Sequence, residues 1–180
     1  MRDAFRLTSA TFEDVTLRTV TERDGENLRQ WKNVNRFLFF FQDVITPEGQ
    51  KEWFKGYLNR ENDYMFIILF CGNLPMGCMG FRLIRGQADI YNVILGLQEM
   101  RKKGLMSKAM KLMCSYILSD FTPHIGLKVL RSNSSAVEWY KKNGFYEVTR
   151  HEKFLELQLD TVEFQPCEFQ KLSYHASGLD

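Results

Sequence analysis

The feature that most constrains this 180-residue sequence is a run of three apolar segments separated by two short turns. The segments read YMFIILFC, MGCMGFRLI and ADIYNVILGL, and the turns between them read GNLP and RGQ. Short apolar runs bounded by glycine and proline are typical of strands, and turns of this length join neighbouring antiparallel strands. Residues 64–97 are therefore predicted to form a three-stranded antiparallel meander.

The segments before the meander follow other patterns. Residues 14–20, DVTLRTV, alternate as a strand does. Leu28, Trp31 and Val34 recur at helical spacing within residues 22–35, which predicts a helix. A second helix is predicted over residues 45–59, where Thr46 can cap the start and Pro47 suits the first helical position.

The segments after the meander predict two more helices and the closing strands. Apolar residues share one helical face from Gly104 onward, and Asn133 or Ser134 can cap a shorter helix that ends before Gly144. Strands are predicted over residues 124–131, 145–151, 154–159 and 162–169. This order indicates one mixed α/β domain over residues 1–180, with its core at about 14–160 and a mainly antiparallel sheet flanked by helices.

Composition excludes several classes of function. The formal net charge is only +2, so nucleic-acid binding is not expected in spite of the short runs RKK and YKK. The longest apolar run, residues 64–71, is far shorter than the roughly 20 residues that cross a bilayer. The N-terminal stretch carries acids and no apolar core. We therefore expect a soluble, cytoplasmic protein without a signal peptide or membrane contact.

Cysteine and histidine spacing predicts no metal site. The four cysteines form no CxxC pair, and His124, His151 and His175 are isolated from one another. Reduced core or surface thiols are the interpretation that this spacing favours over metal ligands.

A basic loop leads into the third predicted helix, in the stretch EMRKKGLMSKAM at residues 99–110. The first N–H groups of a helix have no helical partner, and the helix dipole places partial positive charge there. Gly104 lets an anion approach the backbone, and Arg101, Lys102 and Lys103 add attraction. A solvated basic turn, with Gly104 serving only the turn, is the alternative. The sequence contains neither GxxxxGK[ST] nor GxGxxG, so the common nucleotide-binding loops are excluded.

Two motifs in order resemble the GNAT acetyltransferases. RKKGLM resembles the acyl-CoA signature of that family, with Arg101 and Gly104 at matching positions and Met106 departing from the small residue expected last. Further along the chain, NSSAVEWYKKNGF resembles a second motif of the family. The resemblance covers roughly residues 15–159 and is strongest to the branch that acetylates protein N-termini and nucleotide-linked amino sugars.

The resemblance implies a GNAT-like acyl-CoA N-acyltransferase fold with acetyl-CoA as co-substrate. Acetyl-CoA is expected in a V-shaped cleft between the strand ending at Gly96 and the strand starting near His124. Pantetheine is expected to pair with the backbone of residues 94–96, and the pyrophosphate with the N–H groups of residues 102–107. The cofactor-binding residues implied are Ile94, Leu95, Gly96, Arg101, Lys102, Lys103, Gly104, Leu105, Met106, Ser107, Asn133 and Tyr140.

The resemblance also implies a mechanism in which an amine attacks the thioester directly. Tyr140 is implied as proton donor to the CoA sulfur, although the residues alone also fit a core tyrosine. Asn133 either bonds the pantetheine arm, caps its helix or does both. The oxyanion donor is expected to be a backbone N–H near Leu95. Asn92 is expected to hold a water in a relay that replaces a single strong base.

Other polar and aromatic residues have plainer interpretations. Asp89 is interpreted as a surface residue near the start of its strand, and Glu48 as support for the first turn of a helix. Phe39, Phe40 and Phe41 are predicted to be core residues, with the lining of an acceptor pocket as the alternative.

The hypothesis is an N-acetyltransferase that acts on a small primary amine such as a nucleotide-linked amino sugar. Two alternatives stay open at this point. One is a protein N-terminal acetyltransferase of the ribosomal-protein type. The other is a non-catalytic acyl-CoA-binding module, favoured by Met106 and by the missing base. The expected partner is a small-molecule amine, and the expected oligomeric state is monomer or homodimer.

Overall fold

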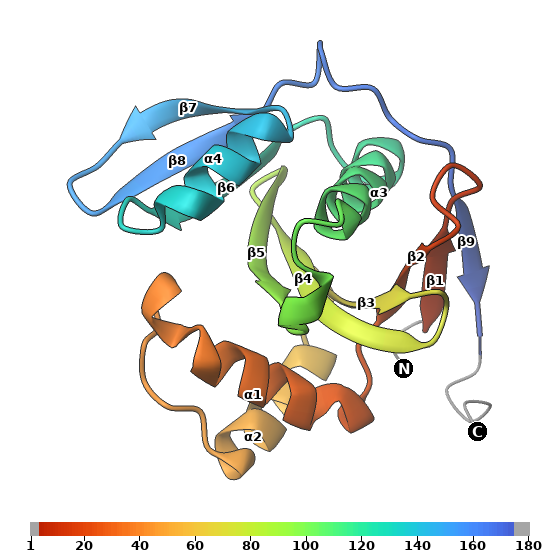
Figure 1. The fold of residues 1–180 in the computed structure, drawn as a ribbon, viewed down its shortest axis with the longest axis vertical. Helices are drawn as coiled ribbons and strands as arrows, with labels where there is room; N and C mark the ends of the chain where they lie inside the picture. The colour runs from red at the N-terminus through yellow and green to blue at the C-terminus, as the bar shows by residue number, and fades with distance from the viewer. Residues whose placement is uncertain (1–3, 175–180) are drawn as a thin grey trace.

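The computed structural model describes residues 4–174, and its strands form one sheet. The order across the sheet is β7-β8-β6-β5-β4-β3-β2-β1-β9 (Figure 1). The strands are β1 (Phe5–Thr8), β2 (Val15–Thr19), β3 (Asp63–Phe70), β4 (Leu74–Ile84), β5 (Gln87–Leu95), β6 (Ile125–Leu130), β7 (Phe145–Arg150), β8 (Phe154–Leu159) and β9 (Gln170–Ser173). The helices are α1 (Gly25–Val34), α2 (Pro47–Leu58), α3 (Leu105–Asp120) and α4 (Ser134–Lys142), with 3-10 turns η1 (Glu22–Asp24), η2 (Arg36–Leu38) and η3 (Gln98–Met100). No helix in the described range is long and apolar enough to span a bilayer.

The mixed α/β class and the antiparallel meander are confirmed. β3, β4 and β5 pair antiparallel in sequence order, and all other strand pairs are antiparallel except β5 with β6. The start of α2 follows the predicted chemistry, since Thr46 Oγ1 accepts a hydrogen bond of 3.0 Å from Gly49 N–H and Pro47 opens the helix. His175 lies outside the described residues.

The prediction of a strand over residues 162–169 is wrong. This segment leaves β8 at one side of the sheet and passes over α3 to the opposite edge, where the next residues form β9 beside β1 (Figure 1). It is held by contacts to α3 instead of a strand ladder, because Cys167 N–H donates to Ser115 Oγ at 3.0 Å. Pro166 also lacks an N–H for pairing. Strand β1, which lies between β2 and β9, was not predicted either.

The sheet separates two hydrophobic clusters. The larger cluster packs α3 and part of α4 against one face, with Leu105, Met113 and Tyr140 among its members. The smaller cluster packs α1 and α2 against the other face through residues such as Leu28 and Tyr57. Figure 1 shows α3 on one side of the central strands and α1 with α2 on the other.

The parallel pair of β5 and β6 is short, and this opens the sheet. Register pairs join Ala88 with Ile125, Asp89 with Gly126 and Ile90 with Leu127, and none follows. Just beyond them, the register of β5 against β4 shifts, and Asn92 adopts a left-handed φ of 50°. A bulge bends its strand and strengthens the local twist. The carboxyl half of β5 is therefore paired on its β4 side only.

Close packing holds α1 against the end of β5. A Cβ placed on Gly96 would lie 2.1 Å from Cε2 of Trp31, a distance that no side chain tolerates. Gly96 N–H also donates to Met76 O at 2.8 Å. Helix α1 thus reaches the sheet at the point where β5 has left β6.

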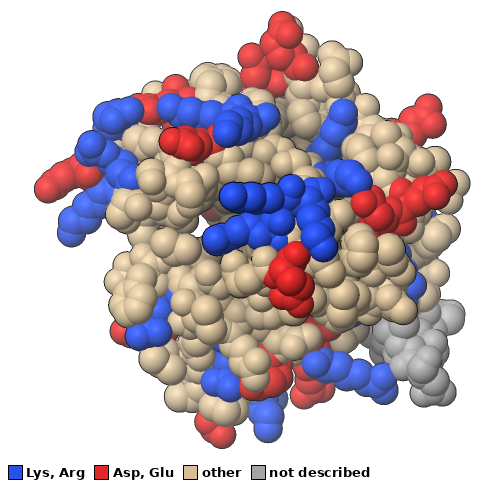
Figure 2. Space-filling model, in the orientation of Figure 1, with Lys and Arg blue, Asp and Glu red and all other residues tan. Residues whose placement is uncertain are grey.

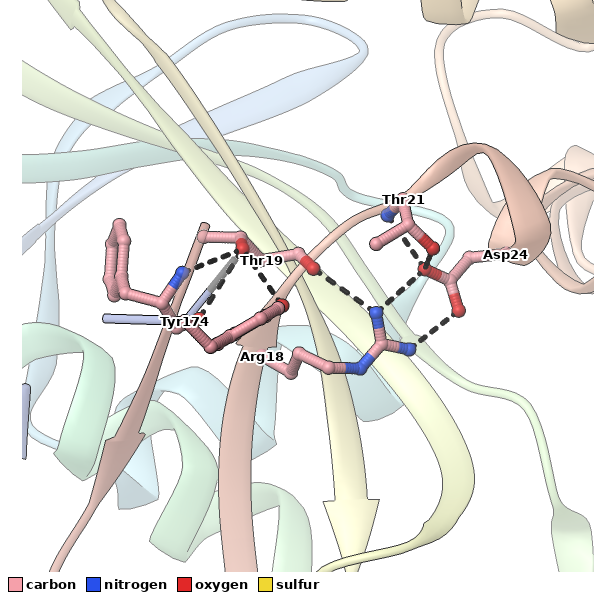
Figure 3. Close-up of polar contacts among 6 residues, drawn as sticks. Arg18, Thr19, Thr21, Asp24 and Tyr174 are labelled. Atoms are coloured by element: carbon pink, nitrogen blue, oxygen red, sulfur yellow. Dashed lines mark hydrogen bonds and ion pairs between the residues drawn. The ribbon is translucent and has the colours of Figure 1, made fainter. Parts of the chain in front are cut away.

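A buried ion pair fixes the start of the α1 layer (Figure 3). Arg18 of β2 donates from Nη2 to Asp24 Oδ1 at 2.7 Å and from Nη1 to Oδ2 at 3.0 Å. Asp24 also accepts from the N–H of Thr21 at 2.7 Å. Both side chains are under one tenth exposed. This bidentate pair ties the turn before α1 to the sheet.

We expect Asp24→Ala to lower the free energy of unfolding by about 3–5 kcal/mol, because it leaves the Arg18 guanidinium buried without a counter-ion. Urea denaturation measures this loss. The exposed pair of Arg150 with Glu147, at 2.7 Å, provides the matched control. Glu147→Ala should change stability little, and an equally small effect of Asp24→Ala would contradict a structural role for the buried pair.

Candidate functional site

A cleft with a volume of about 1010 Å³ opens where β5 parts from β6. Its walls come from β5, the end of β6, the loop before α3 with the first turn of that helix, helix α4, and the segment of residues 38–41. The cleft therefore lies between the two strands that the sequence analysis expected to enclose it.

The loop before α3 has the geometry of an anion site. Gly104 takes the N-cap position with a left-handed φ of 75°, and Lys102 has a φ of 62°. The N–H groups of Ser107 and Lys108 bond to Gly104 O, whereas those of Lys102, Lys103 and Gly104 donate no hydrogen bond within residues 4–174. Apart from Gly104 itself and its chain neighbours, no atom lies within 4 Å of the place where a Cβ of Gly104 would stand. An anion can therefore reach the start of a sixteen-residue helix.

Charge gathers at the same place. Residues 101–104 are all exposed. Figure 2 shows basic side chains grouped in the middle of this face, over the start of α3, and a second basic group over α4 and β7. The positive potential of the loop adds to that of the helix end.

Most of the predicted cofactor-binding residues come together at the cleft. Those that line it are Ile94, Leu95, Arg101, Lys102, Gly104, Leu105, Met106, Ser107, Asn133 and Tyr140. Gly96 and Lys103 are not among the lining residues: Gly96 directs its N–H to β4, and Lys103 is exposed with Nζ 3.7 Å from Met100 Sδ. Met106 packs in part against the larger cluster, so its bulk is shared between core and cleft.

Tyr140 lies at the cleft in a protected position. It is 8% exposed, and its ring packs edge-on against Trp139 and Phe145. Burial raises the pKa of its hydroxyl above the ordinary value of 10.0, so the group is protonated at neutral pH. No side chain or backbone group of residues 4–174 hydrogen-bonds this hydroxyl. Tyr140 is thus both a core residue and a proton-bearing group at the cleft wall.

Helix α4 is joined to α3 beside this tyrosine. Asn133 Oδ1 accepts from Ala136 N–H at 3.3 Å, which makes it the cap of α4. Trp139 of α4 donates from Nε1 to Ser107 Oγ at 3.1 Å. This bond links the first turn of α3 to α4 across one end of the cleft.

Lys32 is the residue at this site that sequence reasoning missed. It reaches from α1 to the bulge of β5, where Nζ donates to Asn92 Oδ1 at 2.8 Å. Its ammonium also lies 3.4 Å from the centre of the Phe39 ring. Burial lowers the pKa of Lys32 from 10.5 to about 8, with a small opposing effect from Cys78. Asn92 was expected to hold a water, but its side-chain oxygen accepts a hydrogen bond from Lys32.

A second cavity of about 510 Å³ lies between the α1–α2 layer and the sheet, and we call it the helix-side cavity. Trp53 and Gln50 of α2 form part of its wall. Six residues line both this cavity and the large cleft: Lys32, Phe41, Arg82, Tyr91, Asn92 and Ile94. The two spaces therefore meet at the bulge of β5.

The prediction that the phenylalanine run forms core is wrong for Phe40 and Phe41, whereas Phe39 packs against the edge of the smaller cluster. Phe40 and Phe41 are 56% and 55% exposed, and Phe39 is half-buried. All three line the cleft, and Phe40 also touches Phe154 of β8 edge-on. The pocket-lining alternative thus describes them better, because all three residues line the cleft and two of them are more than half exposed.

The carboxylates take different positions. Asp89, interpreted as a surface residue, lines the cleft half-buried, and burial raises its pKa. Glu48 is exposed in the first turn of α2 and lines neither space, as that interpretation expected. Asp63 is fully buried beneath Tyr91, accepting from its hydroxyl and from Arg82 Nε at 3.0 Å.

The lowered pKa of Lys32 predicts a pH-dependent stability. Between pH 8 and pH 10.5 the folded protein binds fewer protons at Lys32 than the unfolded chain, so this residue makes stability rise with pH in that window. Lys32→Met removes the cost of burying the cation. We expect its stability relative to wild type to be greatest below pH 8 and to shrink towards pH 10.5, as followed by urea denaturation. Lys51→Met, at an exposed position of α2, should run parallel to wild type. A parallel profile for Lys32→Met would contradict the burial effect.

Solved structures share this fold. A nucleotide-linked sugar GNAT, FdhC in its apo form, superposes with a TM-score of 0.71 at 19% identity, covering 84% of this chain and 89% of that chain. Spermidine N-acetyltransferase from Vibrio cholerae, in complex with CoA and spermine, gives 0.70 at 18% identity, covering 84% and 98%. A protein from Bacillus halodurans gives 0.74 at 18% identity, covering 90% and 92%.

The sequence comparisons bear on the family directly. A search among curated proteins found no significant match. Residues 14–146 match the family described as acetyltransferase (GNAT) domain, and this range holds both motifs, the basic loop and Tyr140. This chain therefore belongs to the GNAT acetyltransferase family.

Proposed function

We propose that this protein is an acetyl-CoA-dependent N-acetyltransferase acting on a small primary amine, with a nucleotide-linked amino sugar as the favoured acceptor. The observation that carries the proposal is the cleft itself. It opens along the unpaired side of β5 and ends at the basic loop and the start of α3. Such a cleft fits a ligand with an extended amide arm and a diphosphate.

The residues present suit coenzyme A in three respects. The β6-facing side of β5 beyond Ile90 has no strand partner, so it can pair with the amides of pantetheine as a strand would. The N–H groups before α3 and the side chains of Arg101 and Lys102 can hold the pyrophosphate. The thioester supplies the acetyl group, and it would then lie near the bulge at Asn92.

The acetyl transfer involves two proton movements: the amine gives up a proton, and the departing sulfur gains one. The amine nitrogen forms a bond to the acetyl carbon, the carbon–sulfur bond breaks, and the amine loses a proton. Tyr140 holds a proton at the cleft wall and can give it to the departing sulfur. A backbone N–H of β5 near Leu95 can stabilise the oxyanion. Asp89 lines the same cleft, and the rise of its pKa through burial improves it as a proton acceptor.

Two features support a small acceptor. The aromatic residues 39–41 line the cleft on the α1–α2 side, where rings can stack on a sugar or base. A nucleotide-linked sugar GNAT is among the structures that share the fold. A spermidine acetyltransferase shares the fold too, so the fold by itself does not set the charge of the acceptor.

Acetyl-CoA binding is tested first by thermal unfolding. At about 100 times its dissociation constant, acetyl-CoA should stabilise the protein by roughly 2.7 kcal/mol, a shift in melting temperature of about 5–10 °C. The double variant Arg101→Ala, Lys102→Ala should lose most of this shift. The matched control replaces two exposed lysines of α2, Lys51 and Lys55, by alanine and should keep it. No shift in wild type at millimolar acetyl-CoA would overturn the proposal.

Tyr140→Phe separates catalysis from binding. It should lower kcat by about 10²–10⁴-fold, since a positioned acid is lost, and leave the acetyl-CoA-induced thermal shift unchanged. Thiol release measures kcat. Tyr146→Phe, at an exposed position of β7, is the control. Full activity of Tyr140→Phe would show that Tyr140 is a core residue only, and binding without any turnover in wild type would favour the non-catalytic acyl-CoA-binding module.

A further inference from the structure

The helix-side cavity is lined by positive charge alone. Among the described residues that line it, the charged ones are Lys32 and Arg82, and both are basic. The neutral residues that complete the wall are Leu28, Phe41, Val44, Ile45, Thr46, Gly49, Gln50, Trp53, Met65, Cys78, Tyr91, Asn92 and Ile94. A cavity of this volume whose charged lining residues are all basic favours a small ligand with negative charge.

Lys32 has no counter-ion. Its ammonium contacts a neutral amide and an aromatic ring, and no carboxylate of residues 4–174 lies within ion-pair distance of Nζ. Removing a cation from water without pairing it is costly, and the lowered pKa of Lys32 reflects this cost. Cys78 and Tyr91, which face the same space, have raised pKa values, so neither supplies a negative charge near neutral pH.

The charge of Arg82 is only partly balanced. Its Nε bonds to Asp63 Oδ2 at 3.0 Å, but the same oxygen accepts from Arg60 Nε at 2.8 Å. Two guanidinium groups therefore share one carboxylate, which is itself fully buried away from the cavity wall. The group as a whole keeps a net positive charge beside Lys32.

A buried amide adds a neutral donor. Gln50 of α2 is 7% exposed and lines the cavity, and its side chain makes no hydrogen bond within residues 4–174. Buried amides are normally bonded, so this group is available to a ligand. Trp53 and Phe41 supply apolar surface for the rest of such a ligand.

We propose that the acceptor amine carries a carboxylate or phosphate group, and that this anion binds Lys32 in the helix-side cavity with Arg82 and Gln50 beside it. The inference rests on the proposed function and narrows its substrate class. Lys32 and Asn92 line both spaces, so an acceptor whose amine and anion lie a few bonds apart can place the anion on Lys32 and the amine in the cleft. A polyamine would instead bring like charge to an unpaired cation.

Matched acceptor pairs test this inference with acetyl-CoA and thiol release. Glucosamine 6-phosphate against glucosamine probes phosphate, and alanine against alaninamide probes carboxylate. We expect wild type to favour the anionic member of at least one pair in kcat/KM by about 10–100-fold. Lys32→Gln, which keeps a donor for Asn92, should remove the preference mainly through KM. Lys32→Arg should keep much of it, and Lys51→Gln should match wild type.

A preference for glucosamine, alaninamide or spermidine over the anionic compounds would overturn the inference. An equal loss of kcat/KM for both members of a pair in Lys32→Gln would overturn it as well. The pair that shows the preference identifies the anion: phosphate for the glucosamine pair and carboxylate for the alanine pair.

A second measurement does not depend on turnover. Trace acetylation of Lys32 by acetic anhydride, followed by mass spectrometry across pH, reports the pKa of its amine. Inorganic phosphate or acetate should raise that pKa and protect Lys32, and the exposed Lys51 should show neither effect. Absence of protection by both anions would overturn the inference even if acetyl-CoA binds. Protection without any acetyl-CoA binding would support the anion site and count against the acetyltransferase proposal alone.

Discussion

The early end of the parallel pairing between β5 and β6 is the constraint on which the site depends. Two parallel strands that stayed paired would bury their backbone in a continuous sheet and leave no cleft. Here the pairs stop at Ile90 with Leu127, and the bulge at Asn92 turns the rest of β5 away. The same step exposes one side of β5, brings the start of α3 to the end of the gap, and lets Lys32 approach from the other face.

The sheet therefore separates the α3 layer from the α1–α2 layer, and the gap between β5 and β6 connects the two faces. On the α3 face lie the basic loop, the cap of α4 and Tyr140, to which the proposed function assigns the binding and protonation of the thioester carrier. On the α1–α2 face lie the half-buried Lys32, the buried amide of Gln50 and aromatic rings. Under the proposed function, two ligands would meet at this opening from opposite faces. The basic residues of the loop are exposed, whereas Lys32 is half-buried and hydrogen-bonded to Asn92.

Much of this arrangement could be predicted from local sequence, because its causes are local. The meander follows from apolar runs and short turns, and the anion site from a glycine between basic residues and a helix. Lys32 and Asn92 are 60 positions apart, and no periodicity signals their contact. The phenylalanine run was misjudged because apolar composition indicates burial and cannot distinguish a core from a cleft wall. Residues 162–169 have strand composition, but a strand there would have to pair at an edge of the sheet, and the two edges are formed by β7 and β9.

The separation into two hydrophobic clusters has a consequence for how such a chain can diversify. The α1–α2 cluster meets the rest of the molecule chiefly through the far face of β3 to β5 and through the Arg18–Asp24 tie at its start. The side chains of this cluster are separate from those that pack against α3, so the two layers can be substituted independently. Under the proposed function, selection could exchange one acceptor for another while the basic loop and Tyr140 are inherited unchanged, so that recognition and chemistry would evolve at different rates.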